Sequence, residues 1–125
     1  MSSQNFAERI QEYKATIHQL PDVNDAARIQ YTVKRLEGLH FVPTLILPIE
    51  RFTSLSKVDI LREIDRIANL SEQEIHASGV RINQEVQETK IEQIGLLVYH
   101  FTLLTRLRQD DPLAWDEIDE LYGDD

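Results

Sequence analysis

Two residue pairs near position 40 have the types and spacing for chemistry, and both include His40. Glu37 and His40 form a Glu-x-x-His pair. On a helix this spacing brings the two side chains to one face, as in the carboxylate–histidine metal sites of helical proteins. Such a site needs a second pair, and the sequence has none. Gly38 inside the pair also favours the end of a helix. We therefore expect no metal and no cofactor.

Arg35 and His40 form the second pair, with the spacing Arg-x4-His. An arginine and a histidine held together can polarise a phosphate group and transfer its proton. The spacing resembles the Arg-x4-to-6-His signature of the HEPN family, whose members are helical ribonucleases that often act as dimers. The resemblance implies, as an alternative function, a small helical RNA-cleaving enzyme in which Arg35 and His40 meet at a dimer cleft.

Other catalytic arrangements find little support in the sequence. The chain has no cysteine, which excludes disulfides, thiolate catalysis, zinc–thiolate sites and iron–sulfur clusters. It contains no glycine-rich phosphate loop. Tyr99 and His100 lie in an apolar stretch, where a core histidine with one satisfied hydrogen bond is expected. We therefore predict that the protein is not an enzyme.

The charge of the chain is concentrated in its last sixteen residues. The net charge is −9, and eight carboxylates but no lysine or arginine lie between Asp110 and Asp125. Residues 1–109 are almost neutral, with fourteen acidic and thirteen basic side chains. The acidic segment also holds the only tryptophan, Trp115. A segment that is both acidic and apolar can dock on its own fold or on a basic, hydrophobic partner, and both readings stay open.

For the second reading, the sequence predicts a partner-binding set on one short helix over Leu113–Tyr122. Asp before Pro112 is a good helix opening, and Gly123 ends the helix. The apolar members would supply the buried anchor, with Trp115 foremost, and the carboxylates would steer a basic protein. The predicted residues are Leu113, Trp115, Asp116, Ile118, Asp119 and Tyr122.

The net charge and the distribution of apolar residues also limit where the protein can be located and which partners it can bind. An acidic balance makes nucleic acid an unexpected partner, because phosphates need a basic face. The first residues show no apolar run of signal-peptide type. The longest nearly uncharged stretch, Gly38–Ile49, is too short to span a bilayer. We therefore expect a cytoplasmic protein without membrane contact.

The pattern of apolar residues predicts an all-α fold, a helical bundle of about five helices in a chain of one-domain size. A proline-containing apolar crossover over residues 38–50 is expected to be buried, either extended or with one short turn starting at Pro48. Its alternative use is an exposed partner groove or an edge strand. Helices are expected over about Ser3–Leu20 with Ser2 or Ser3 as the cap, Asn24–Glu37, from about Ser56, Ser71–Gln109 and Leu113–Tyr122.

The stretch Ser71–Gln109 contains no proline over 39 residues. A single helix of that length would measure about 58 Å, whereas a domain of this size has a radius of gyration of about 14 Å. The helix must therefore break, with Ser78–Gly79 the expected place, or project towards a partner. Its later half is apolar on all sides, so other helices, a second copy of the chain, or both must cover it.

Together these observations predict a non-enzymatic interaction module: an adaptor, an inhibitor, or an assembly or regulatory factor. Residues 1–109 would form the helical domain and residues 110–125 an acidic C-terminal helix and tail. The module is expected to self-associate, as a homodimer, and to engage a basic partner protein through the tail.

Overall fold

The computed structural model describes residues 5–37, 47, 49–82 and 85–122. Every regular element in these ranges is a helix, so the all-α prediction is confirmed. The expected number of about five helices is not confirmed, because the stretch Ser71–Gln109 forms two helices and a short helix precedes α4. The helices are α1 (Phe6–Gln19), α2 (Ala26–Glu37), α3 (Ile49–Phe52), α4 (Lys57–Ala68), α5 (Glu72–Ala77), α6 (Val86–Arg108) and α7 (Pro112–Tyr122).

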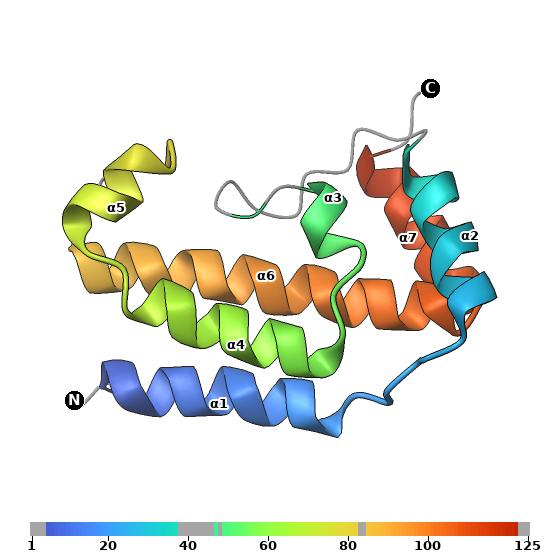
Figure 1. Cartoon of the computed structure of the whole chain (residues 1–125), viewed down its shortest axis with the longest axis horizontal. Coiled ribbons are helices and arrows are strands. Elements are labelled where there is room, and N and C mark those ends of the chain that lie inside the picture. Colours follow the sequence, from blue (N-terminus) through green and yellow to red (C-terminus); the bar gives the residue numbers. More distant parts are fainter. Residues whose placement is uncertain (1–4, 38–46, 48, 83–84, 123–125) are drawn as a thin grey trace.

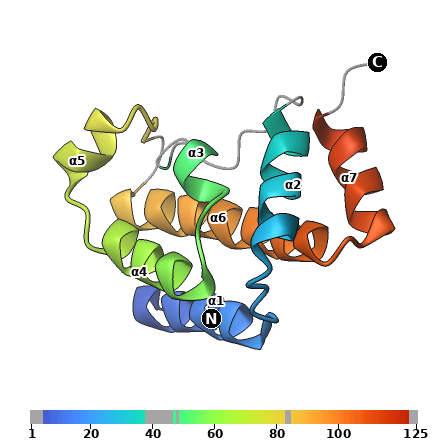
Figure 2. The same ribbon diagram turned by 45° about the vertical axis from the view of Figure 1, so that its right-hand side comes forward.

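The arrangement is organised around α6. Helices α1, α4 and α6 pack against one another and lie side by side, with α4 running opposite to the other two (Figure 1). Helices α2 and α7 both pack on α6 and stand next to each other over its C-terminal end (Figure 2). The short α5 lies near the opposite end of α6. Among the helices that the structure describes, none is long and apolar enough to cross a membrane.

Helix α6 is buried on most of its circumference. Ile94 and Leu97 have no exposed surface, and on other sides of the helix Leu103 is 2% exposed and Leu107 1% exposed. A helix that is apolar all round must be central, and here α1, α2, α4 and α7 of the same chain cover it. The predicted central position of this segment is therefore confirmed. Of the coverings considered for this segment, the described structure shows other helices of the same chain along much of α6.

Three helices begin with a capping box, in which side chain and backbone satisfy each other's hydrogen bonds. Ser56 with Asp59 opens α4 and Ser71 with Glu74 opens α5, as predicted. The predicted cap of α1 at Ser2 or Ser3 was wrong. Asn5 caps α1, because its Oδ1 accepts the amide of Glu8 at 2.8 Å while the Glu8 carboxylate accepts the amide of Asn5.

The long apolar stretch breaks at the predicted place. Helix α5 ends at Ala77, and Gly79 follows with a φ of +89°. Glycine adopts this left-handed conformation without steric cost, so the chain can turn there before α6 begins. The crossover over residues 38–50 lies mostly outside the described residues. Of these residues, Leu47 is buried and only 1% exposed, and α3 begins at Ile49.

Three long cationic side chains each join the C-terminal end of one helix to a residue of another helix. Lys57 Nζ donates to the carbonyl oxygens of His18 and Leu20, 3.0 and 2.6 Å away, at the end of α1. In the same manner, Lys90 Nζ reaches Ala68 O at 3.0 Å and Arg108 Nη2 reaches Thr53 O at 2.8 Å. Carbonyls at a helix C-terminus lack partners in their own helix and carry negative potential. Each cation therefore stabilises a helix end as well as a helix–helix contact.

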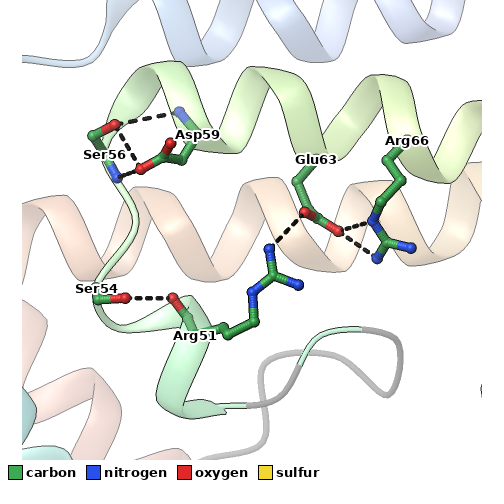
Figure 3. A network of polar contacts seen from close by, with 6 residues as sticks. All are labelled: Arg51, Ser54, Ser56, Asp59, Glu63 and Arg66. Carbon is green, nitrogen blue, oxygen red and sulfur yellow. Dashed lines mark hydrogen bonds and ion pairs between the residues drawn. The ribbon is translucent and has the colours of Figure 1, made fainter.

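A buried carboxylate fixes α3 against α4 (Figure 3). Glu63 on α4 is only 4% exposed. It accepts a hydrogen bond from Arg66 Nε at 2.5 Å and lies 3.5 Å from Nη2 of Arg51, which belongs to α3. A buried carboxylate is stable only when paired and hydrogen-bonded. Glu63 therefore depends on both arginines.

Helix α1 packs so closely on α6 that a side chain at Gly95 would collide with Tyr13. A Cβ atom at this position would lie 2.8 Å from the hydroxyl oxygen and 3.3 Å from Cζ of Tyr13. Gly95→Ala should therefore lower the free energy of unfolding by about 1–2 kcal/mol through overpacking. In a Tyr13→Ala background the same change should raise it by up to about 1 kcal/mol, because alanine is the better helix former. Urea denaturation of the four proteins measures both; equal effects in the two backgrounds would contradict the close approach.

Candidate partner-binding surface

The turn between α6 and α7 sets the direction of the acidic helix. The amide of Asp110 donates to Leu107 O at 2.9 Å and that of Asp111 to Arg106 O at 3.1 Å. This double closure is the Schellman arrangement, whose first residue after the cap is left-handed and most often glycine. Here that residue is Asp110, with a φ of +62°. Asp111 then caps α7 by accepting the amide of Leu113 at 3.0 Å, and Pro112 takes the first helical position, as predicted.

One face of α7 is docked on the protein's own fold. Ala114 and Ile118 have no exposed surface, Trp115 is 3% exposed and Tyr122 is partly buried. Of the two uses open to an acidic, apolar segment, the described structure therefore shows the first. In this state Trp115 and Ile118 are not accessible to a partner.

Trp115 is enclosed by side chains of α2. The guanidinium carbon of Arg35 lies 3.9 Å from the centre of the indole ring, a cation–π contact. The ring of Tyr31 meets the indole edge-on, with 6.3 Å between centroids, and its hydroxyl accepts a hydrogen bond from Arg35 Nη1 at 3.4 Å. The indole Nε1 is buried without a hydrogen-bond partner in the part of the chain that the structure describes.

The structure thus gives Arg35 a packing role. His40, its predicted catalytic companion, lies outside the described residues. The RNA-cleaving alternative, with Arg35 and His40 at a dimer cleft, stays a prediction, and His40→Ala tests it on candidate RNAs.

Polar contacts between α6 and α7 reinforce this docking. Tyr99 donates to Glu117 Oε2 at 2.8 Å. This hydrogen bond raises the pKa of Tyr99. His100, 4% exposed, places Nδ1 2.8 Å from Leu96 O and Nε2 2.6 Å from the Tyr122 hydroxyl. Because a carbonyl only accepts, we assign the proton to Nδ1, so that Nε2 accepts from Tyr122. His100 is buried, as expected, and each of its ring nitrogens has a hydrogen-bond partner.

The opposite face of α7 is open to solvent. Leu113 is 69% exposed and Leu121 52% exposed, and Asp116, Asp119 and Glu120 are exposed beside them. On the adjacent surface of α6, Tyr99 is 45% exposed and Leu96 40% exposed. We call the set Leu113, Asp116, Asp119, Glu120 and Leu121 the outer face of α7.

The predicted partner-binding set is thus divided between two faces. Trp115, Ile118 and partly Tyr122 attach the helix, whereas Leu113, Asp116 and Asp119 face solvent. The sequence reasoning missed Glu120 and Leu121, which helical spacing alone places on the side of Leu113, seven and eight residues away.

A pocket of about 350 Å³ lies beside the start of α7. It is formed by the first half of α2, the last turn of α6 and the α6–α7 turn. Its walls carry both signs of charge, and Arg28 Nη1 lies 3.8 Å from Asp110 Oδ2. The lining residues are Asp25, Ala27, Arg28, Tyr31, Leu107 and Asp110.

Within the described ranges, no group of three or more histidine, aspartate or glutamate side chains is placed to hold a metal ion.

Comparison of the chain with protein-family models, with curated proteins and with solved structures finds no match in any of the three. The function must therefore be argued from the surface of the molecule itself.

The docked state of α7 predicts the emission of Trp115, the only tryptophan. Because the indole is buried and its Nε1 has no acceptor among the described residues, the free protein should emit at shorter wavelength than exposed tryptophan and resist quenching by acrylamide. Ile118→Ala, which removes a neighbouring anchor, should increase quenching. Red-shifted, freely quenched emission from the unmodified protein would show that α7 is undocked in solution.

The α6–α7 turn also predicts a pH effect. The hydrogen bond from Arg106 Nε, 3.0 Å from Asp111 Oδ2, is the main cause of a lowered pKa of Asp111. A carboxylate with a lowered pKa in the folded state stabilises the fold above its unfolded pKa, about 3.9. That contribution is lost as the pH falls through the folded pKa.

Asp111→Asn keeps the helix cap but cannot titrate. Its melting temperature should therefore fall less than that of the parent between about pH 5 and about pH 3. Arg106→Gln, which removes the partner, should flatten the profile in the same way. If both variants retain the full slope of the parent, Asp111 is not the group that responds.

Proposed function

We propose that this protein is a non-enzymatic interaction module, acting as an adaptor, an inhibitor, or an assembly or regulatory factor, and that the outer face of α7 binds a partner protein with a basic surface. One observation carries the proposal. Helix α7 is attached through Trp115 and Ile118, while the three carboxylates and two leucines of its outer face are exposed to solvent. Self-association and a cytoplasmic location belong to the same proposal.

The charge of the outer face is available for a partner. The structure assigns Glu117 to Tyr99 and Arg106, and Asp111 to Arg106. In contrast, Asp116, Asp119 and Glu120 make no ion pair with any residue in the described ranges. These three carboxylates belong to an acidic segment attached to a near-neutral body of residues 1–109. They create a local negative field, which attracts a cationic surface and speeds its association.

The apolar part of the outer face can supply affinity as well as attraction. Charges at the rim of an interface mainly affect the association rate, whereas desolvated apolar side chains at its centre hold the complex together. Leu113 and Leu121 lie on the solvent side of α7. Glu117 lies between them around the helix and accepts a hydrogen bond from Tyr99 of α6. The anchoring role first predicted for Trp115 is therefore assigned to these leucines, which need no undocking of α7.

The proposal is tested by removing the charge of the outer face. Asp116→Asn/Asp119→Asn/Glu120→Gln should slow association with a captured basic partner by about tenfold or more at low salt, because steering raises such rates by 10-fold to 1000-fold. Raising ionic strength from about 0.1 M to about 1 M shortens the screening length from about 10 to about 3 Å, and should slow the parent similarly. Surface plasmon resonance with the partner immobilised measures both.

A matched control removes three carboxylates at the other end of the molecule. Glu72→Gln/Glu85→Gln/Glu92→Gln changes the net charge equally, on α5 and the beginning of α6, far from α7 (Figure 1). This variant should associate at nearly the parent rate. Equal slowing by both variants would mean that only overall charge matters, and an unslowed outer-face variant would rule out this surface.

A further inference from the structure

The pocket beside the start of α7 has the size of a site for one side chain or one small molecule. Its volume of about 350 Å³ falls at the lower end of the range for ligand pockets. Leu107, 1% exposed, forms an apolar floor, and Tyr31, 53% exposed, offers the side of an aromatic ring. Such a floor and wall suit an aliphatic stem that ends in a polar group.

Two carboxylates on different elements line this pocket, and hydrogen bonds hold the side chain of Asp25 and the backbone of Asp110. Asp25 Oδ1 accepts the amides of Ala27 at 3.0 Å and Arg28 at 3.3 Å, so the carboxylate is held at the beginning of α2. Asp110 is held by the hydrogen bonds of the α6–α7 turn, in a left-handed conformation where glycine is usual. An aspartate there costs more than glycine would, yet it directs a carboxylate into the wall of the pocket.

The cation now paired with Asp110 is weakly held. Arg28 Nη1 and Asp110 Oδ2 are 3.8 Å apart, and the two side chains are 45% and 61% exposed. Pairs of this kind contribute little to stability, so Arg28 can leave Asp110 at small cost. With two carboxylates and one arginine, the lining favours a cation over an anion. Tyr31 adds to that preference, because an aromatic ring attracts guanidinium and ammonium groups.

We infer that this pocket receives one arginine or lysine side chain of the basic partner, with its charged group between Asp25 and Asp110 and its stem against Leu107. The inference rests on the proposed function, because the partner is the one that the outer face of α7 attracts. Asp110 precedes the exposed Leu113 by three residues, so the pocket and this part of the outer face lie at the same end of α7. The occupant takes over the position of Arg28 opposite Asp110.

The test uses the whole protein and N-acetyl-arginine amide as the probe. The amide resonances of Ala27 and Arg28, which donate to Asp25, should shift saturably in an NMR titration. N-acetyl-citrulline amide, the neutral isostere, should shift them at least about tenfold more weakly, as expected for the loss of one charge-assisted contact. Equal responses to the two probes, or no saturable response to arginine, would overturn the inference.

Two variants separate the pocket from the outer face. Asp25→Asn/Asp110→Asn removes both charges but keeps the fold, because asparagine caps helices as well as aspartate and tolerates the left-handed region. It should weaken arginine binding about tenfold or more, whereas Asp116→Asn/Asp119→Asn should leave it unchanged. Binding that survives the pocket substitutions would refute the site.

The same proteins distinguish this inference from the proposed function. If the partner needs the outer face but neither the partner nor arginine responds to the pocket substitutions, the pocket inference alone fails. If arginine binds the pocket but the partner ignores the outer face, the proposed function fails and the cation site remains. Support for the full inference requires that Asp25→Asn/Asp110→Asn weakens both arginine and the partner.

Discussion

The fold depends on covering a helix that is apolar all round. Helix α6 extends for 23 residues, about 35 Å, and buries residues such as Ile94, Leu103 and Leu107 on different sides. No single neighbour can cover such a surface. Helices α1 and α4 pack along it, and α2 and α7 stand over its C-terminal end (Figures 1 and 2). The acidic helix is therefore part of the core, and its proposed binding surface is the face that this packing leaves exposed.

This requirement decides where the charge of the molecule lies. Helix α7 must turn Ala114, Trp115 and Ile118 inward to cover α6, and a helix that buries one stripe exposes the opposite one. Asp116, Asp119 and Glu120 then point outward for geometric reasons. The arginine of α2 that stacks on Trp115 adds a second constraint. This contact of Arg35 orients α7 relative to α2. The pocket lies where the first half of α2 meets the α6–α7 turn.

Local signals in the sequence predicted much of the fold. The capping boxes at Ser56 and Ser71 and the glycine at position 79 predicted where helices begin or end, because caps and left-handed turns depend on neighbouring residues. The box at Asn5 was available by the same rule and was missed. The site was harder to predict. The local sequence does not distinguish a Trp115 buried by its own fold from one buried by a partner. The contact that decides it, with Arg35, joins residues eighty positions apart.

The two carboxylates of the pocket differ from those of the outer face in a way that matters for recognition. Flexible surface carboxylates attract a cation over several ångströms but fix no geometry, and salt screens them. The side chain of Asp25 is held by amides at the beginning of α2, and the backbone of Asp110 by the closure of α6, so part of the entropy of ordering them is already lost before any partner binds. Fixed groups of this kind specify where a charge must sit. In the proposed complex, the outer face would bring a basic surface close, and the pocket would determine its register on α7.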